Sequence, residues 1–302
     1  MPGQTGCLRA GTYSGGIRFN DGGSPGHPIV LRSYPGEQAL VTGRTYIPRG
    51  SNYLAIADLS LNGAHQPNNG VLPSPTVDAD HVTFEFDDIT NDHTAICFDL
   101  GNPVYGTANS TVIADSRIHG CGRLPADNHE HGIYVDHAIA TTITGNWIYD
   151  NADRGIQLYP SAQRTRIADN VIAGNGEGII FSGAEGLASS NNLVEHNVIA
   201  DSLIRADIES FYPAGNPIGV ANTARENCLS GGHPTVDRLA GGFRTVGNVV
   251  APPDFVDPTI GDLRLRQDSP CARIAPAVPR APDTNGSDST GTSQIPGPRD
   301  HS

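Results

Sequence analysis

The sequence predicts an all-β fold in which short strands wind into a solenoid of stacked coils. Two consecutive segments repeat one another, "TTITGNWIYDNADRGIQLYPSAQ" (141–163) and "TRIADNVIAGNGEGIIFSGAE" (165–185). Both read I-x-x-N-x-I-x-x-N, then a short loop, then Gly-Ile, and equivalent asparagines lie 24 residues apart. Strands this short cannot bury a face alone, so stacked neighbours have to supply the core.

The repeat extends on both sides of this pair and keeps asparagine at a fixed corner. "TVIADSRIHGCG" (111–122) precedes the pair, and Val194, Asn197 and Ile199 repeat the pattern after it. Asparagine tolerates the left-handed conformation of a tight corner, and stacked amides can hydrogen-bond along a ladder. We therefore expect such a ladder along Asn146, Asn170 and Asn197. A leucine-rich repeat is disfavoured, because the LxxLxL frame and a helical pattern are both missing.

Composition narrows the function classes. The chain has 36 Gly and 23 Pro but no Gly-X-Y period, which excludes collagen. All 19 basic residues are arginine and the net charge is −13, so neither nucleic acid nor an anionic membrane surface is an expected partner. No apolar run approaches the roughly 18 residues of a membrane-spanning helix. The lack of lysine also excludes a lysine base and a P-loop.

The cysteines and the last stretch of the chain bear on its domain organisation. There are five cysteines, so at least one thiol stays unpaired. Cys228 and Cys271 flank the last structured region, which suggests a disulfide between them as a hypothesis. Residues 276–302 are rich in Pro, Gly and Ser and predict a disordered tail. We expect one domain over residues 1–275, with a capping segment at its C-terminal end.

The repeats resemble those of a known superfamily. "HGIYVDHA" (131–138) with the two repeats that follow resembles the right-handed parallel β-helix coils of the pectate-lyase-like superfamily. "HPIVLRSYPGEQALVTG" (27–43) is similar to first coils of that superfamily, and residues 247–271 to its C-terminal segments. The resemblance implies a single-stranded right-handed parallel β-helix over roughly residues 3–275. It is specific for fold rather than activity, because the superfamily includes lyases, epimerases, hydrolases and tailspikes.

Alternation along the strands that begin Gly-Ile predicts which side chains face outward. His131, Arg154 and Glu177 each stand directly before the glycine of such a strand, and we expect them to stack on successive coils. Outward-facing residues of successive coils should form columns, and Cys97 and Asp99 are expected to begin these columns on the coil before Tyr134. The residues predicted to fill the core are Ile133, Val135, Ile156, Leu158, Ile179 and Phe181. Those predicted to face outward are Tyr134, Asp136, Gln157, Tyr159, Ile180 and Ser182.

One loop breaks the period at this face. "GCGRLPADNHEH" (120–131) is much longer than the matching "NADR" and concentrates acidic and imidazole side chains beside Tyr134, Asp136 and His137. The resemblance implies that a substrate groove runs along these strands and the loops before them. The candidate substrate-binding residues are His129, Glu130, Gln157, Glu177 and Ser182.

The first chemistry that fits is β-elimination or C5-epimerisation of a uronic-acid sugar. Both reactions need a partner for the C5 carboxylate, a base for the C5 proton and usually an acid for the leaving oxygen. Arg154 could pair with the carboxylate, His131 could take the proton, and Tyr134 or Tyr159 could donate one. The DPH-type epimerase motif and the ordered calcium-aspartate set of pectate lyases are absent.

Two other chemistries and a non-catalytic role stay open. Hydrolysis by paired carboxylates could use Asp136, Glu130, Glu177 or Asp127, although the NTD, GDD and GHG motifs are absent as a set. A metal could bind His129-x-His131 with an acidic neighbour, or Ca²⁺ could bind Asp99 and Asp136. A cation would offset the repulsion between this acidic protein and a polyuronate. Because exposed histidines and aspartates are common in loops, the alternative is a non-catalytic solenoid that binds glycan or acts as a scaffold.

The function predicted from the sequence is therefore a carbohydrate-active β-helix protein, foremost a polysaccharide lyase or C5-epimerase. The expected partner is an acidic polysaccharide, and the expected state is a monomer. The expected location is extracellular or on the surface of a bacterium, although Met1-Pro2-Gly3 does not begin a signal peptide.

Overall fold

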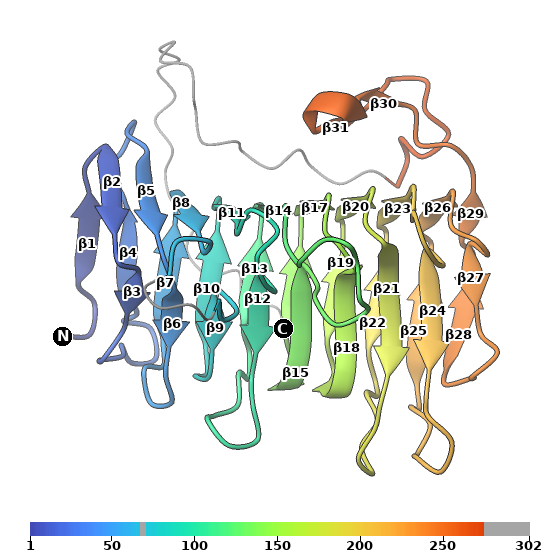
Figure 1. Ribbon diagram of the computed structural model, residues 1–302, viewed down its shortest axis with the longest axis horizontal. Helices are drawn as coiled ribbons and strands as arrows, with labels where there is room; N and C mark the ends of the chain where they lie inside the picture. The colour runs from blue at the N-terminus through green and yellow to red at the C-terminus, as the bar shows by residue number, and fades with distance from the viewer. Residues whose placement is uncertain (67–70, 275–302) are drawn as a thin grey trace.

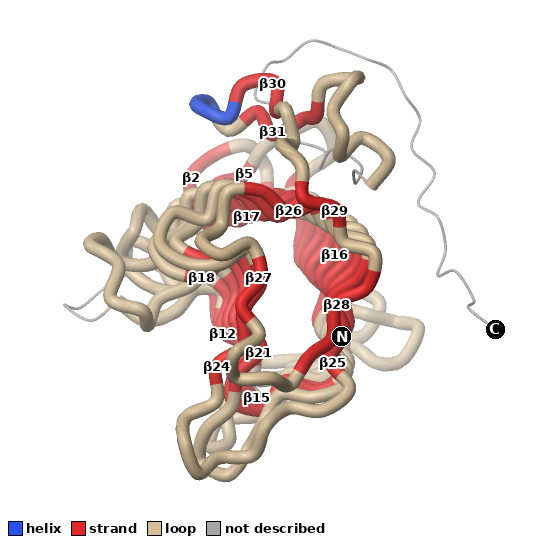
Figure 2. Tube along the Cα trace, turned by 90° about the vertical axis from the view of Figure 1, so that its right-hand side faces the viewer, coloured by secondary structure: helices blue, strands red, loops and turns tan. Residues whose placement is uncertain are grey.

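The computed structural model of the protein describes residues 1–66 and 71–274. Its strands form three parallel sheets, A, B and C, that run the length of the molecule (Figure 1). Each coil gives one strand to each sheet in turn, so strands three apart in the chain pair with one another. Viewed along the axis, sheet C lies on the left, sheet B at the top and sheet A on the right (Figure 2). The predicted all-β parallel solenoid is confirmed.

The strands of the three sheets have the following bounds. Sheet A consists of β1 (Thr5–Leu8), β4 (Ile29–Ser33), β7 (Leu54–Ala57), β10 (Val82–Glu85), β13 (Val112–Ala114), β16 (Thr142–Thr144), β19 (Arg166–Ala168), β22 (Leu193–Glu195), β25 (Asn222–Arg225) and β28 (Phe243–Val246). Sheet B consists of β2 (Gly11–Ser14), β5 (Ala39–Thr42), β8 (Leu59–Asn62), β11 (Asp88–Thr90), β14 (Arg117–His119), β17 (Trp147–Tyr149), β20 (Val171–Ala173), β23 (Val198–Ala200), β26 (Cys228–Ser230) and β29 (Val249–Val250). Sheet C consists of β3 (Ile17–Arg18), β6 (Thr45–Ile47), β9 (Thr76–Val77), β12 (Phe98–Leu100), β15 (Ile133–Ile139), β18 (Arg154–Gln163), β21 (Glu177–Ser182), β24 (Ile208–Phe211) and β27 (Val236–Asp237).

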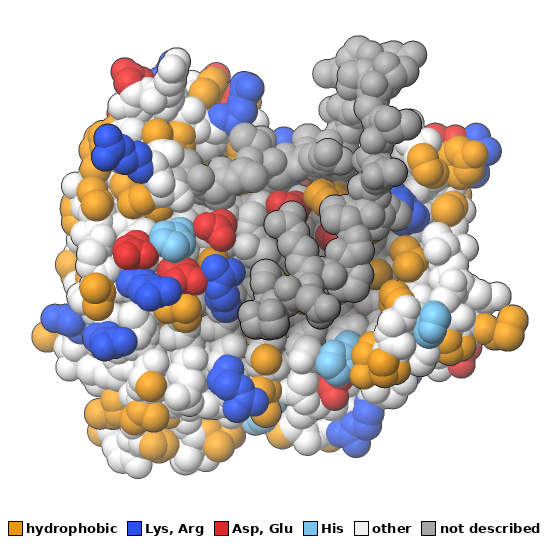
Figure 3. Space-filling view, turned by 180° about the vertical axis from the view of Figure 1, so that it is seen from behind, with side chains coloured by type: hydrophobic (Ala, Val, Ile, Leu, Met, Phe, Trp, Pro, Cys, Tyr) orange, Lys and Arg blue, Asp and Glu red, His pale blue; other side chains and the backbone are white. Residues whose placement is uncertain are grey.

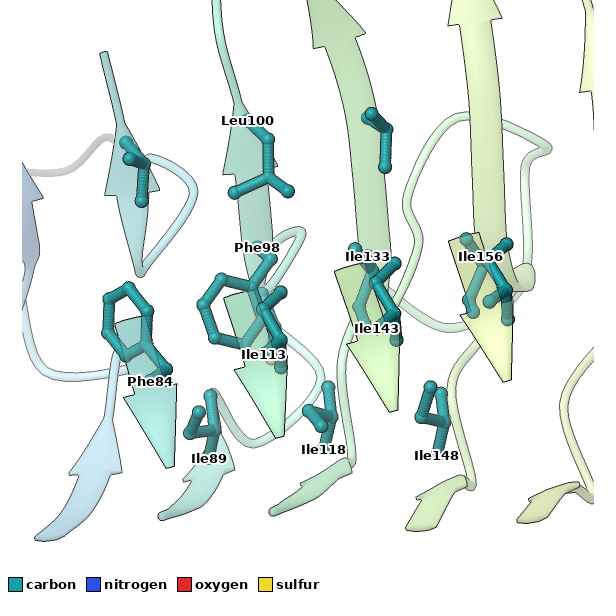
Figure 4. Close-up of a cluster of buried hydrophobic side chains, with 14 of the residues drawn as sticks. Phe84, Ile89, Phe98, Leu100, Ile113, Ile118, Ile133, Ile143, Ile148 and Ile156 are labelled. Atoms are coloured by element: carbon teal, nitrogen blue, oxygen red, sulfur yellow. The ribbon is translucent and has the colours of Figure 1, made fainter. Parts of the chain in front are cut away.

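The core is a set of aliphatic stacks with phenylalanines among them, of which Figure 4 labels Phe84 and Phe98. Phe84 and Phe98 meet edge to face with ring centroids 4.9 Å apart, and isoleucines continue the stacks on later coils. The six side chains predicted to point inward from the Gly-Ile strands are all fully buried. Burying one such side chain stabilises the fold by roughly 2 kcal/mol. Period-2 alternation therefore identified the core side of sheet C correctly.

An asparagine ladder occupies the corner between sheets A and B. The Nδ2 group of Asn146 donates to Oδ1 of Asn170 at 3.0 Å, and Asn170 donates to Oδ1 of Asn197 at 2.9 Å. The ladder continues through Asn227 to Asn248. Each of the three predicted members also donates to a backbone carbonyl of an earlier coil. The predicted ladder is confirmed.

Two disulfides fasten the coils. The predicted Cys228–Cys271 bond is present. A second bond, Cys97–Cys121, was not predicted. Cys97 does not head an outward column: it is buried, because β12 starts one residue later and Cys97 lies level with Gly132 on the next coil. Cys7 keeps an exposed free thiol.

The segment after β29 folds back along the side of the solenoid. It contains an antiparallel pair, β30 (Phe255–Asp257) and β31 (Asp262–Leu265), joined by the short 3₁₀ helix η1 (Pro258–Ile260). Phe255 and Leu263 pack with Trp147 and Val198 on the outer face of sheet B, at the top of Figure 2. We call residues 251–274 the C-terminal strap. The tail predicted for residues 276–302 lies outside the described residues, and within the described ones no helix is long and apolar enough to cross a membrane.

Sheet A forms the back of the molecule as it is drawn in Figure 1, and Figure 3 shows this face (Figures 2 and 3). Acidic and basic side chains gather at one side of it in Figure 3. On the outer side of sheet A, Glu195 accepts hydrogen bonds from both Arg166 and Arg225, at 2.8 and 2.9 Å. Both guanidinium groups remain more than two-fifths exposed while the Glu195 carboxylate between them is buried, so this triad is a partly exposed surface network.

Candidate active site on sheet C

The candidate site lies on the outer face of sheet C, where the loop 120–131 folds back between β14 and β15. A pocket of about 290 Å³ opens there, and we call it the sheet C pocket. All four predicted catalytic residues line it: His131, Tyr134, Arg154 and Tyr159. Three predicted substrate-binding residues also line it: His129, Gln157 and Ser182. The outward residues of β15, β18 and β21 are thus brought together.

The column before the glycines forms as predicted. The amide of Gly132 donates to the carbonyl of Arg154 at 2.9 Å, which places His131 level with Arg154. Arg154 pairs in register with Glu177 on the next coil. All three side chains are buried, with exposed fractions of 3%, 4% and 2%. A column of buried ionisable groups at the edge of a pocket is an arrangement that shifts protonation equilibria.

His131 is held in its neutral form. Burial, reinforced by the neighbouring Arg154 and His129, lowers the pKa of its imidazole well below the ordinary histidine value. Among the described residues, its Nδ1 atom has no hydrogen-bond partner. Its ring centroid lies 5.9 Å from that of Tyr134. A neutral imidazole beside an open pocket is able to accept a proton.

The two tyrosines of the pocket are held in their protonated form. Burial raises the pKa of the Tyr134 hydroxyl far above its ordinary value, and Asp136, Asp99 and Glu185 raise it further. Burial also raises the pKa of Tyr159, with Glu185 and Asp136 acting in the same direction. The two rings lie near parallel with centroids 6.2 Å apart. Both hydroxyls are therefore hydrogen-bond donors rather than bases.

Arg154 is engaged by the protein itself. Its Nη1 donates to the carbonyl of Asn128 at 3.1 Å, and its Nη2 donates to Oδ1 of the same residue at 2.6 Å. Its Nε lies 2.9 Å from Oε2 of Glu177, an ion-pair distance without the alignment of a hydrogen bond. Burial raises the pKa of Glu177, which Arg154 partly opposes. The guanidinium predicted to bind a substrate carboxylate thus already has two protein partners, Asn128 and Glu177.

Glu130 and Asp153 shape the loop rather than the pocket. Glu130 forms an ion pair with Arg123 and accepts from its backbone amide at 2.7 Å. Asp153 accepts from the amides of Asn128 and Glu130, at 2.9 and 2.8 Å. Glu130 therefore does not line the sheet C pocket, because its carboxylate closes the root of the loop. Asp153 and Asn128 were not predicted: Asn128 lies in the inserted part of the loop, and Asp153 is aligned with Glu130 and Gly176, so its position does not repeat one residue type.

A second pocket lies on the other side of the Asn128–Arg154 contact. It has a volume of about 280 Å³, and Asp127, Asp153, Glu177 and Arg205 are among its lining residues. Glu177, predicted to bind substrate, lines this pocket rather than the sheet C pocket. Phe211 and Pro213 were not predicted but form the far wall of the sheet C pocket. Phe211 ends β24 and Pro213 follows it, and the repeat pattern of this strand is weak in the sequence.

The predicted metal residues lie next to Tyr134, Asp99 on the preceding coil and Asp136 two residues further along β15. Asp99 pairs in register with Tyr134, and burial together with Asp136 and Asp78 raises its pKa to about 7. The Oδ1 atom of Asp136 lies 2.7 Å from Nδ1 of His137. Among the described residues, no three His, Cys, Asp or Glu side chains are grouped so as to hold a metal ion. The described residues at Asp99 and Asp136 therefore do not form a complete metal site. Calcium binding stays a prediction, and the reaction proposed below does not use a cation.

Comparison with known proteins gives the family. Residues 76–229 match the family described as "right handed beta helix region", so the chain belongs to that family. A pectate lyase structure superposes with a TM-score of 0.63 at 15% identity, covering 89% of this chain and 82% of that one. The A-module of a mannuronan C-5 epimerase from Azotobacter vinelandii gives 0.61 at 15% identity, covering 82% of this chain and 68% of that one.

An alginate lyase from Paenibacillus sp. gives a TM-score of 0.55 at 17% identity, covering 83% of this chain and 93% of that one. Among curated proteins, no sequence matches the chain. At these identities the structural similarities establish the right-handed parallel β-helix of the pectate-lyase-like type and nothing about activity.

Proposed function

We propose that this protein is a polysaccharide lyase that removes the C5 proton of a uronic-acid residue and cleaves the bond from C4 to the glycosidic oxygen. One observation carries the proposal: His131 and Tyr134 share a pocket, and their surroundings shift their pKa values in opposite directions. Two titratable groups whose environments push them apart are suited to the roles of base and acid.

The proposed step balances as follows. The neutral imidazole of His131 takes the C5 proton, and the electrons of that C–H bond form the C4=C5 double bond. The C4–O bond breaks, and the leaving oxygen takes the hydroxyl proton of Tyr134. Proton exchange with water returns both side chains to their starting forms. The products are a 4,5-unsaturated uronate and a new reducing end, so no oxidant or reductant is needed.

The arrangement favours elimination over epimerisation. His131 directly precedes β15 and Tyr134 projects from its outer side, so both address a bound sugar from the same sheet face. Elimination with the proton and the leaving oxygen on one face of the ring uses such a pair. Epimerisation needs a proton donor on the opposite face of C5, whereas the proposed base and acid both come from the β15 side of the pocket. Tyr159, stacked on Tyr134, is proposed to orient the sugar ring.

The setting proposed for this activity is outside the cell. Two disulfides are typical of proteins from oxidising compartments, and polymeric glycans occur there. We therefore propose an extracellular or cell-surface location in a bacterium and a polysaccharide as the partner.

A panel of uronate-containing and neutral polysaccharides tests the proposal. Elimination produces absorbance near 235 nm together with new reducing ends. His131→Gln and Tyr134→Phe should each lower the rate by roughly 10²–10⁴-fold, while the matched variant Tyr105→Phe, on an exposed loop, should not. Unchanged rates in both site variants would contradict the assignment.

Because His131 acts in its neutral form, the rate should persist below the ordinary histidine pKa and fall as the imidazole becomes protonated at lower pH.

Hydrolysis is the second candidate, and one observation favours it. The raised pKa of Asp99, about 7, suits a general acid, and Asp136 lies on the adjacent coil. New reducing ends without absorbance at 235 nm, lost in Asp99→Asn, would replace the lyase proposal with this one. Neither signal with any polymer, but measurable glycan binding, would favour a non-catalytic solenoid.

A further inference from the structure

We infer that the uronic-acid residue enters the sheet C pocket with its carboxyl group uncharged, as an ester. The inference rests on the proposed lyase function and specifies its substrate class. It follows from the lack of a free cation in the described lining, from the carboxyl groups that act on the two tyrosines and from the apolar wall of the pocket.

The ionisable groups that raise the pKa of both tyrosines are carboxyl groups, which are negative above their own pKa values. Asp136, Asp99 and Glu185 all raise the pKa of Tyr134, although His137 and Arg44 partly offset the first two. Asp136 and Glu185 act in the same way on Tyr159. A carboxylate bound beside these hydroxyls would lose its hydration and meet three carboxyl groups. Burying an anion without a partner is strongly unfavourable.

The guanidinium in the wall does not compensate for these charges. Arg154 is 4% exposed, and Asn128 accepts from both of its terminal nitrogens. Glu177, 2.9 Å from Nε, offsets its charge. The chain contains no lysine that could replace it. His129 reaches the rim, but its side chain is 80% exposed and 3.6 Å from Asp127. The described lining of the pocket therefore holds no unpaired permanent cation.

The far wall of the pocket suits an alkyl group. Ile180, Phe211 and Pro213 form it, and Phe211 is 53% exposed although it is a large apolar side chain. An aromatic ring left open at the edge of a pocket gains free energy when an apolar group covers it. Gln157, between this wall and Tyr134, brings a neutral amide to the place where an ester carbonyl would lie.

The chemistry of the proposed step agrees with an ester. Removing a proton from C5 beside a carboxylate places a second negative charge on the same group, which demands a nearby cation. Beside an ester the developing charge is single, and neutral donors such as an amide and a phenol can stabilise it. The ester bond itself is not broken, so the product is an unsaturated uronate ester.

Matched polymers test the inference. The substrates are alginate against propylene glycol alginate, and polygalacturonate against highly methyl-esterified pectin, each followed at 235 nm at equal uronate concentration. We expect the esterified member of at least one pair to react at least about tenfold faster. A charged polymer that reacts equally well or faster overturns this inference but leaves the lyase proposal standing. Reaction with neither member of either pair overturns the lyase proposal and the inference with it.

A charge variant gives an independent readout. At pH 8, where Asp99 with its pKa of about 7 is mostly ionised, Asp99→Asn/Glu185→Gln removes two of the three carboxylates that act on Tyr134 and leaves His131 and Tyr134 in place. The ratio of rates on charged and esterified polymer should shift toward the charged polymer by about tenfold. The control Asp268→Asn changes an exposed carboxylate on the C-terminal strap and should leave the ratio unchanged. An unchanged ratio in the double variant would overturn the electrostatic argument.

Discussion

Two sets of buried polar side chains stack along the same coils and differ in how they are bonded. In the asparagine ladder, Asn170 accepts from the backbone amide and the side chain of Asn146, and its own amide donates to Asn197 and to two carbonyls. At the head of sheet C, by contrast, Nδ1 of His131 and both carboxylate oxygens of Glu177 have no aligned partner among the described residues.

This difference in hydrogen bonding separates polar side chains that stabilise the fold from polar side chains that are available for chemistry. A buried polar group that is fully hydrogen-bonded stabilises the fold, whereas one without a partner costs about 1–3 kcal/mol. Proteins keep such groups mainly where a donor or acceptor has to remain free for chemistry. We therefore read the ladder as scaffold and the column at the head of sheet C as the site, although both are buried and repeat from coil to coil.

The largest effect on stability is expected in the ladder. Asn170→Ala leaves the partners of one amide unsatisfied on two neighbouring coils, so the free energy of unfolding should fall by about 3 kcal/mol. Denaturant unfolding measures it, with Asn20→Ala, on an exposed residue, as the control. Equal effects of the two substitutions would remove the distinction between the two regions.

A smaller effect is expected at the ion pair of the site. Glu177→Gln leaves Arg154 buried without a counter-charge, although its bonds to Asn128 remain, so we expect a loss of about 2 kcal/mol. Arg154→Met/Glu177→Leu should recover most of that stability. Arg225→Met in the triad of sheet A should cost less than Glu177→Gln, because the Arg225 guanidinium is partly exposed and Glu195 keeps Arg166 as a partner. A buried pair that behaves like the surface triad would contradict its assignment as desolvated.

The smallest effect on stability is expected from the ionisation of Asp207, which lies on the coil after Glu177. Asp207 is fully buried level with Gly178, and burial raises its pKa to about 7. Between the ordinary aspartate pKa of about 4 and this value, the folded state holds a proton that the unfolded state has lost, so stability falls as pH rises. We expect this carboxyl to contribute a loss of about 1 kcal/mol per pH unit between pH 5 and pH 6. Thermal unfolding of Asp207→Asn should show a flatter dependence, and parallel curves would show that Asp207 is ionised throughout.

The parts of the fold that follow the repeat were predictable from the sequence. The core side chains of sheet C, the ladder and the stacking of His131 on Arg154 all depend on alternation and a fixed offset, which are local properties of the chain. The loop 120–131 has no repeat to follow. The approach of Asn128 to Arg154 depends on how Asp153 and Glu130 hold the loop, and no spacing in the sequence encodes that path.

Cys97 shows the same limit on a smaller scale. Alternation from Asp99 places Cys97 on the outside, but the strand begins at Phe98, and the residue before it turns inward to bond with Cys121. Strand starts are set by the corner before them rather than by the pattern within them. The long loop thus begins at a covalent anchor, which helps to explain why an insertion of this length can present a defined surface.

The C-terminal strap makes unravelling of the solenoid directional. A stack of coils held by nearest-neighbour contacts frays from its ends. At one end the strap covers sheet B and is bonded covalently to β26, so those coils cannot peel away singly. At the other end the strands β1, β2 and β3 are largely exposed, so opening begins there. The coils that carry His131, Arg154 and Glu177 lie toward the fastened end and stay folded while the first coils exchange their amide protons with water.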